Sequence, residues 1–374
     1  MSARCVVLTL GRLPVALDLA RGFAAIGYRV VVAEPFSMHM CGMSRAVAKS
    51  VRVSDPREDA DAYLDDLERV VVDEQATLVV PVSEETPRVA ALRQRLPDDV
   101  RVFSGPQDHV LALHDKYRFV ETARSLGLDA PASRLPDAAD DLHASDGYVI
   151  KPRYSCSGRG VRFSEEPGGA SGDEFVQARV AGEEVSGFAV ARDGRLLVST
   201  TYRATVTSGS VAVCFDGTEP VPAAERWMET FVAATKHTGF IAFDFILDID
   251  GRCWALECNP RATSGLHFVE PPDLARLIAG VAESATAKRG KLTESWSCFT
   301  ALLGSLPDRR RFARIFRELR EARDVSWRAS DPLPFVLMPI NTAPLLARAL
   351  RARETIAAVA MRDLEWREPP PIPS

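Results

Sequence analysis

The sequence lacks several features that mark specialised classes of protein. No apolar run approaches the ~20 consecutive residues that a membrane-spanning helix needs, so we expect no membrane partner. The seven cysteines form no CxxC pair and no metal-finger spacing, and no basic leader precedes an apolar run near residue 1. We therefore expect reduced thiols and a cytoplasmic location. The net charge of −5 offers no overall basic surface, and we expect no nucleic acid partner.

Two glycine-rich nucleotide-binding fingerprints are also missing. The first predicted strand-to-helix turn contains Gly11 alone, where a dinucleotide-binding turn has three spaced glycines. The segment YSCSGRGV at 154–161 contains glycines but not the GxxxxGK[ST] order, and no helix pattern follows it. A nicotinamide cofactor is therefore disfavoured, and any phosphate-binding loop in this chain must be of another kind.

The composition, 46% hydrophobic and 26% charged, is that of an ordinary globular protein, and 374 residues suggest two or three domains. In the first part of the chain, short apolar runs alternate with amphipathic segments, which predicts βαβ units and a parallel sheet. We therefore expect an α/β domain over residues 1–104. Its predicted strands are 5–10, 28–33, 77–82 and 100–103, and its predicted helices are 14–26, 60–74 and 84–96.

After residue 104 the pattern changes to hairpins and separate helices, which predicts an α+β region over 105–290. Asp193-Gly194 joins two alternating segments and is typical of a hairpin turn. From 291 to 374 we expect a mainly helical C-terminal extension. Its arginine-rich segment 308–324 contains one apolar stripe, so packing on the body is favoured over a nucleic acid or membrane role. The stripe consists of Phe312, Ile315, Phe316 and Leu319.

A candidate metal site lies where two runs rich in β-branched and aromatic residues flank Asp250-Gly251. If this pair forms a two-residue hairpin turn, Asp244 faces Glu257 with Cβ atoms about 5 Å apart. Asn259 then lies on the same face because strand side chains alternate. Two acids and an amide oxygen are a ligand set suited to Mg²⁺. The alternatives are a solvent-exposed strand that carries acids, or a longer turn with another register.

Candidate phosphate contacts occur at two lysines. Lys151 ends a strand pattern and begins a loop of small residues, 155–160, whose backbone N–H groups can approach phosphate oxygens. The alternative interpretation of this segment is a flexible hairpin loop without a phosphate-binding role. Lys116 lies in the first turn of a helix that Asp115 can cap, where it opposes the helix dipole and so hints at an anion nearby. Glu84 follows a predicted strand at a common ligand edge, although complementing a helix dipole is the favoured alternative.

Five motifs occur in the order in which they occur in ATP-grasp enzymes: HDKYRF, YVIKPRYSCSGRG, FVQARVAGEEVSG, FDFILDIDG and ALECNPR. Each motif is weak, but the ordered set is specific. On these motifs residues 106–285 resemble an ATP-grasp domain. Residues 1–104 resemble the Rossmann-like domain that precedes it in carboxylate–amine ligases and carbamoyl-phosphate-synthase-like enzymes. The resemblance implies an ATP-grasp fold with a lid subdomain near 115–175.

The resemblance also assigns roles to individual positions. It implies that two lysines contact the phosphates of ATP, that the glycine loop covers them, and that a hinge and an acid hold adenine and ribose. Ala178 stands where an acid is frequent, which leaves part of the adenine contact open. Asp244, Glu257 and Asn259 match ligands of Mg²⁺, for which Mn²⁺ can substitute. The implied nucleotide-binding positions are Lys116, Lys151, Ser155, Ser157, Gly158, Gly160, Gln177, Ala178, Val180 and Glu184.

The implied reaction begins with phosphorylation of a carboxylate, which gives an acyl phosphate that an amine can attack. Arg261 and Lys151 would neutralise the transferred phosphoryl group. His267 is a candidate base for the amine proton, although a lone histidine is more often structural. Arg203 and Glu84 are candidate substrate contacts, and for Arg203 a surface ion pair is an equal alternative.

We therefore expect an ATP- and Mg²⁺-dependent ligase that joins a small-molecule carboxylate to a small-molecule amine. Whether it acts as a homodimer stays open. The alternatives are phosphorylation of a carboxylate or carbamate without amide formation, and a non-catalytic ATP-binding regulatory module. The regulatory module is disfavoured because both lysines, the glycine loop and all three predicted metal ligands are present.

Overall fold

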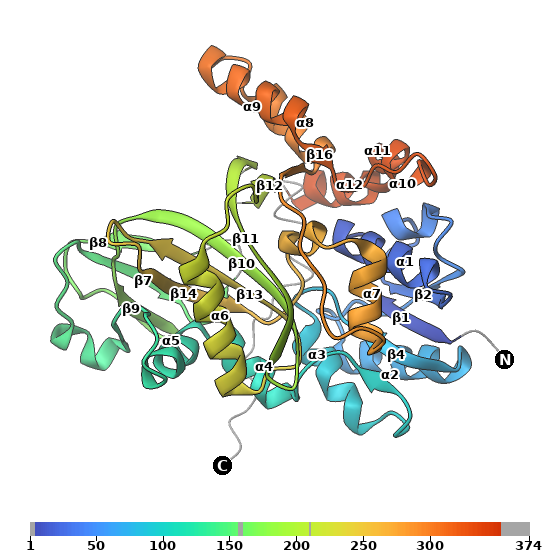
Figure 1. Ribbon diagram of the computed structural model, residues 1–374, viewed down its shortest axis with the longest axis horizontal. Helices are drawn as coiled ribbons and strands as arrows, with labels where there is room; N and C mark the ends of the chain where they lie inside the picture. The colour runs from blue at the N-terminus through green and yellow to red at the C-terminus, as the bar shows by residue number, and fades with distance from the viewer. Residues whose placement is uncertain (1–3, 156–159, 209–210, 353–374) are drawn as a thin grey trace.

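The computed structural model describes residues 4–155, 160–208 and 211–352, which form three β-sheets with helices around them (Figure 1). The first sheet is parallel throughout, in the order β3-β2-β1-β4-β5. Its strands are β1 (Cys5–Thr9), β2 (Arg29–Glu34), β3 (Lys49–Arg52), β4 (Ala76–Val80) and β5 (Arg101–Val102). Its helices are α1 (Pro14–Ala25), α2 (Ala60–Asp73) and α3 (Thr86–Ala91), with the 3-10 turns η1 (Met40–Met43) and η2 (Leu92–Gln94).

The central strands of this sheet are apolar on both faces because helices cover both faces. Leu8 of β1 belongs to the core cluster that contains α1, whereas its neighbour Val7 belongs to the cluster that contains Tyr63 of α2. The predicted parallel sheet with its covering helices is confirmed. Strand β3 was not predicted, because the side chains of its sequence KSVR are mostly exposed and no apolar run marks it.

The second region begins with two helices, α4 (Gln107–His114) and α5 (Lys116–Ser125), and a small antiparallel sheet. Asp115 caps α5 as predicted, since its carboxylate accepts from the N–H groups of Tyr117 (3.1 Å) and Arg118 (3.2 Å). The small sheet has the order β6 (Ser133–Arg134), β9 (Glu174–Ala178), β7 (Tyr148–Pro152) and β8 (Arg162–Ser164), with η3 (Pro136–Asp141) beside it.

The largest sheet joins the centre of the chain to its later part. Its order is β14 (Cys253–Asn259), β13 (Gly239–Leu247), β10 (Glu183–Arg192), β11 (Arg195–Ser208), β12 (Val211–Asp216), β15 (Lys291–Thr293) and β16 (Arg323–Asp324). Helices α6 (Pro222–Thr235) and α7 (Pro271–Ala279) and the turn η4 (Ser264–Phe268) accompany it. The hairpin predicted at Asp193-Gly194 is confirmed, because both residues have the positive φ of 49° and 79° that this tight turn requires.

The parallel sheet and the largest sheet share one hydrophobic core. Leu8 and Val32 of the parallel sheet belong to the same cluster as Phe188 of the largest sheet and Leu274 of helix α7. Helices α1 and α7 approach closely where Gly22 lies, since a Cβ built there would be 2.0 Å from the carbonyl oxygen of Pro271. The carboxyl edge of the parallel sheet is thereby fixed next to strands β13 and β14.

The C-terminal part contains α8 (Ser295–Gly304), α9 (Arg309–Glu321), α10 (Leu333–Val336), α11 (Met338–Asn341) and α12 (Ala343–Ala352). Helices α8 and α9 project from the body, while α10 to α12 lie near α1 (Figure 1). Of the predicted stripe, Ile315 is buried and Phe312 and Leu319 pack beside it, but Phe316 is 45% exposed. None of the helices that the structure describes is long and apolar enough to cross a membrane.

Candidate active site

The predicted acid pair is present, but the turn that was predicted to create it is wrong. Asp244 of β13 pairs with Glu257 of β14, as expected. The hairpin loop is longer than two residues, since the N–H of Asp248 bonds to the carbonyl of Arg252. That longer loop shifts the register by one, and a bulge at Leu256 shifts it back, because Phe245 pairs with Ala255. The two deviations cancel at the acid pair.

The bulge also frees a backbone acceptor for a buried lysine. The Lys151 ammonium, at the end of β7, donates to the carbonyl oxygen of Leu256 at 3.3 Å. Lys116, at the start of α5, donates to the carbonyl oxygen of Ser155 at 2.6 Å and lies 3.2 Å from a carboxylate oxygen of Glu257. Both lysines are about 95% buried, at 4% and 5% exposure. Two cations from different elements therefore meet one acid pair.

Burial and neighbouring charges shift the pKa values of the ionisable groups in this cluster. Burial lowers the pKa of Lys151 to about 8, although Glu257 opposes the change. Burial alone would raise the pKa of Glu257, but the charges of Lys116 and Lys151 outweigh it and hold that pKa below its ordinary range. Burial and the charge of Glu257 raise the pKa of Asp244. The acid pair therefore holds a proton more readily than separated acids would, and a cation between the two carboxylates would relieve the same repulsion.

Asn259 completes the predicted ligand set. Its amide nitrogen lies 3.4 Å from Asp244, and its amide oxygen accepts from Arg261 at 3.2 Å. Ser186, which pairs with Asp244 on the neighbouring strand β10, donates to the same carboxylate at 3.1 Å. Among the described residues no three His, Cys, Asp or Glu side chains gather at one point. The chemistry of a metal site here rests on two acids and one amide, which suits a hard divalent cation.

Arg261 connects this cluster to the parallel sheet. Its guanidinium donates to Glu84, in the loop after β4, with an Nε–Oε1 distance of 2.8 Å. His114 lies 3.8 Å from the same carboxylate. Burial opposes ionisation of Glu84, but the charge of Arg261 outweighs it and lowers the pKa of that carboxyl. In this structure the Glu84 carboxylate is therefore an ion-pair partner of the Arg261 guanidinium.

His267 forms a buried pair with Asp18 of α1, with an Nδ1–Oδ2 distance of 2.7 Å. Its other ring nitrogen, Nε2, is buried without a hydrogen-bond partner among the described residues. An acid on one ring nitrogen fixes the orientation and tautomer of the imidazole and leaves the other nitrogen to act. Among the described residues no hydrogen bond or ion pair joins this buried pair to the acid pair or to the two lysines.

The residues expected to hold a nucleotide line β7, β9 and β10. Gln177 is buried and its amide donates to Ser133, Ala178 donates its N–H to Ala132, and Val180 is half-buried. Glu184 is exposed on β10. In the glycine loop, Ser155 is buried and Gly160 has a φ of 76°, while Ser157 and Gly158 lie outside the described residues.

Arg203, a candidate substrate contact, is held in a bidentate ion pair. Its Nε and Nη2 atoms donate to the two carboxylate oxygens of Glu183 at 2.8 and 2.9 Å. This is the surface ion pair that was the equal alternative. A role for Arg203 at a substrate would require exchange of Glu183 for another carboxylate.

Sequence reasoning missed three residues of the site, Asp18, His114 and Ser186. Ser186 could have been found, because it alternates on a predicted strand beside the acid pair. Asp18 lies inside a helix whose sequence neighbours carry no chemical signal, whereas His114 opens the motif HDKYRF beside Asp115 and Lys116. His114 reaches Glu84 because α4 packs beside α5 and β14, whereas Asp18 meets His267 where α1 packs on η4.

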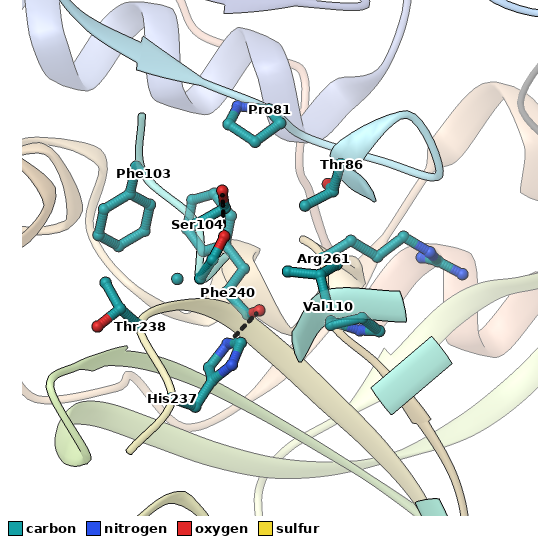
Figure 2. A pocket seen from close by; sticks show the side chains of 12 residues that line it. Pro81, Thr86, Phe103, Ser104, Val110, His237, Thr238, Phe240 and Arg261 are labelled. Atoms are coloured by element: carbon teal, nitrogen blue, oxygen red, sulfur yellow. Dashed lines mark hydrogen bonds between the residues drawn. The ribbon is translucent and has the colours of Figure 1, made fainter. Parts of the chain in front are cut away.

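A crevice between the parallel sheet and β13 lies behind Arg261 (Figure 2). His237 lines it and bonds through Nε2 to the carbonyl oxygen of Phe240 at 3.1 Å, while its Nδ1 lies 3.1 Å from Nε2 of His109. Figure 2 shows the Arg261 side chain extending away from His237, Thr238 and Phe103. The crevice therefore lies on the side of Arg261 that faces away from its guanidinium.

Comparison with known proteins gives a family match over part of the chain. Residues 113–265 match the sequence model of a family described as ATP-grasp domain. A search of curated protein sequences gives no match. The matched segment begins before α5 and ends after β14, so it contains both lysines and all three predicted metal ligands.

Solved structures resemble the chain in fold at low identity. The biotin carboxylase domain of 2-oxoglutarate carboxylase from Hydrogenobacter thermophilus is 12% identical with a TM-score of 0.62, over 78% of this chain and 74% of that one. N5-carboxyaminoimidazole synthetase from Staphylococcus aureus is 13% identical with a TM-score of 0.60, over 83% and 89%. L-amino acid ligase from Bacillus licheniformis is 16% identical with a TM-score of 0.56, over 72% and 70%. These likenesses confirm the predicted fold.

Proposed function

We propose, from the match of residues 113–265 to the ATP-grasp domain model, that the protein is an ATP-dependent ligase that activates a carboxylate as an acyl phosphate and joins it to an amine. The observation that carries the proposal is the buried cluster in which Lys116 lies 3.2 Å from Glu257 and Lys151 lies against the Leu256 carbonyl. Buried cations beside paired acids are costly unless a charged ligand completes them. A triphosphate with its divalent cation would do so.

In this proposal Lys116 and Lys151 bind phosphate oxygens of ATP. Asp244, Glu257 and Asn259 would hold Mg²⁺, or Mn²⁺ in its place, which supplies positive charge to the phosphates. The ligands bound in two structures of similar fold support a nucleotide and a divalent metal as cofactors. The Hydrogenobacter thermophilus domain is a complex with MgADP and bicarbonate, and the Staphylococcus aureus synthetase is a complex with ADP.

The nucleoside would lie along β9 and β10. Gln177, Ala178 and Val180 would face adenine through the hinge after β9, and Glu184 at the exposed start of β10 would accept from the ribose hydroxyls. The exposure of Glu184 supports the second role, because its carboxylate is available to a ligand.

Transfer of the phosphoryl group needs positive charge at a fixed place. Arg261 would supply it, and its ion pair with Glu84 at 2.8 Å supports the proposal because the pair holds the guanidinium in one orientation. We therefore assign Glu84 as a positioning residue for Arg261 as well as a candidate substrate contact. Arg203 stays a candidate contact for a substrate carboxylate.

The attacking amine must lose a proton near neutral pH. We propose that Nε2 of His267 accepts it, with Asp18 holding the ring through the 2.7 Å contact at Nδ1. Loss of the proton leaves a neutral amine that attacks the acyl phosphate, and inorganic phosphate leaves as the C–N bond forms.

The test is ADP release over panels of carboxylates and amines with ATP and Mg²⁺, with products identified by mass. ADP that requires both substrates, together with a new amide mass, is the expected result. ADP with only a phosphorylated acid would replace the ligase with a carboxylate kinase. ATP binding without turnover for every pair would favour a regulatory module.

A further inference from the structure

Two cysteines lie against each other where the C-terminal helices join the largest sheet. The thiol of Cys214 on β12 donates to Sγ of Cys298 on α8 at 3.3 Å. Both side chains are fully buried and both thiols are free. The hydroxyl of Thr293 on β15 lies 3.2 Å from Sγ of Cys214. No other two cysteines in the described part of the chain are joined by a hydrogen bond, and the function proposed above uses none of these three residues.

Backbone hydrogen bonds set the distance between the two sulfurs. Cys214 lies opposite Thr293 in the antiparallel pairing of β12 and β15. The next residue, Glu294, donates its N–H to the carbonyl oxygen of Val213 at 2.9 Å and accepts from the N–H of Cys298 at 2.8 Å. The first turn of α8 is therefore anchored on β12, and Cys298 lies one helical turn beyond the anchor. The thiols face each other as long as this turn is folded.

The separation of the sulfurs is within reach of a covalent bond. A disulfide bond is about 2 Å long. Sulfurs that start 3.3 Å apart therefore need to approach by roughly 1.3 Å, which small rotations of the two side chains can supply. The backbone contacts between β12 and α8 can stay in place during this change.

The two thiols differ in acidity, which gives them different roles in oxidation. The hydrogen bond that Cys214 donates lowers the pKa of Cys298. The same hydrogen bond, followed by burial, raises the pKa of Cys214. The thiolate is the form that reacts with an oxidant. Cys298 is therefore the thiol that reacts first, and Cys214 is placed to react with the product.

Access to the pair depends on the C-terminal helices. The two cysteines belong to a small hydrophobic cluster with Ile315 of α9, and helices α8 and α9 project from the body (Figure 1). Phe299 and Leu303 of α8 stay exposed, so only part of the apolar surface of α8 is packed. A region with so little buried surface opens more readily than the main core. A small oxidant can reach the sulfurs during such openings.

We propose that Cys214 and Cys298 are a modification site, at which hydrogen peroxide forms a reversible disulfide that fastens α8 to β12. The Cys298 thiolate attacks one oxygen of the peroxide, which gives a sulfenic acid and releases hydroxide. The sulfur of Cys214 then attacks the sulfenic sulfur, the S–S bond forms and a second hydroxide leaves. The hydroxides take up the protons that the two thiols lose. Two thiols and one peroxide thus give one disulfide and two water molecules, and a dithiol reverses the reaction.

The experiment treats the folded full chain with hydrogen peroxide, blocks the remaining thiols with iodoacetamide, and maps the peptides by mass. The expected product is a cross-linked pair of peptides that contain Cys214 and Cys298. The pair should be lighter by two hydrogen atoms than the separate peptides, and it should disappear after dithiothreitol. Hydrogen exchange of α8 is expected to slow by roughly 10-fold or more in the oxidised protein, because the bond opposes local opening. Exchange of β13 should stay unchanged.

Two variants and one matched control test the assignment. Cys298→Ala should remove the cross-link and the slower exchange together. Cys214→Ala leaves Cys298 without its partner, so dimedone, which traps sulfenic acids, should label Cys298 in that variant. The control is Cys5→Ala, which removes another buried free thiol, on β1, and should leave the yield of the cross-link unchanged. Should either variant of the pair fail to fold, the peptide map of the wild type decides by itself.

Three outcomes would overturn the proposal. The first is the absence of the cross-link at peroxide concentrations that already oxidise methionines of the same chain. The second is a mixture of cross-links in which this pair is no more frequent in the folded chain than in the chain unfolded in urea. The third is the cross-link without slower exchange of α8, which would mean that the bond does not fasten the helix. None of these outcomes depends on ADP release.

Discussion

Two regions of the molecule collect charged side chains, and they differ in burial. In the cluster between α5 and β14, Lys116 and Lys151 are almost fully buried beside Glu257. On α9, by contrast, arginines face solvent, and the ion pairs of Lys291 with Glu318 and Glu321 are partly exposed. Exposed pairs contribute little because water screens them, whereas buried charges shift each other's pKa and demand a ligand. Burial of the charges, rather than their number, distinguishes the candidate site from α9.

The packing under the two regions differs in the same way. Strand β13 rests on an aromatic cluster in which Trp227 and Phe231 stack at 5.0 Å and Phe243 meets both rings edge-on. Helices α8 and α9 rest on a smaller cluster around Ile315 and Cys298, and Phe299 and Leu303 of α8 stay exposed. The site is therefore built on the rigid part of the molecule, and the projecting helices form a region of lower local stability.

The largest effect is expected for Glu257→Gln. The change removes the negative charge that neutralises both lysines and that would bind the metal. We therefore expect ADP release to fall by about 10³-fold or more. Circular dichroism should show an intact fold, because the amide keeps the shape of the side chain. The matched change on α9, Glu318→Gln, should leave ADP release unaltered. Near-normal activity of Glu257→Gln would remove the metal assignment.

The next effect in size is expected for Asp18→Asn, which removes the carboxylate that positions His267. General base catalysis contributes typically 10²- to 10⁴-fold, and we expect a loss of about 10²-fold at pH 7. The loss should shrink as pH rises toward 9, because amines there lose their proton to solvent. A pH–rate profile separates this from a structural defect, which would lower the rate equally at every pH. The surface change Asp273→Asn is the control.

A stability effect is expected for Ile315→Ala on α9, where the side chain is 1% exposed. Truncation of a buried isoleucine costs about 2–4 kcal/mol. Hydrogen exchange should show faster opening of α8 and α9 only, with protection of β13 and ADP release unchanged. Equal loss of protection at β13 would mean that the two regions unfold as one unit.

The smallest effect is a dependence of stability on pH from the pair His109 and His237 behind Arg261. Burial, followed by the neighbouring His109, lowers the pKa of His237 to about 3. An unfolded chain binds this proton near pH 6.5, so the stabilisation is complete above that pH and is lost as pH falls toward 3. The slope from this group is about 1.4 kcal/mol per pH unit. Urea unfolding between pH 6 and 4 should show a slope lower by that amount in His237→Gln.

Some features of the fold follow from local sequence because their causes are local. The alternation of apolar runs predicted the parallel domain, Asp115 predicted the start of α5, and Asp193-Gly194 predicted a tight hairpin. The facing of Asp244 and Glu257 was predicted correctly from a wrong turn, since the longer loop and the bulge offset each other. The bulge exposes the Leu256 carbonyl, which accepts a hydrogen bond from Lys151 of another sheet.

The sequence by itself determined which elements the candidate residues lie on, because strand alternation, helix capping and turn residues act within a few positions of the chain. Only the tertiary structure decided their partners. Glu84 and Arg261 are 177 positions apart, and Asp18 and His267 are 249 apart. No periodicity links such positions. They meet because the parallel sheet and the largest sheet bury one common core, and this packing brings residues that are distant in sequence into contact.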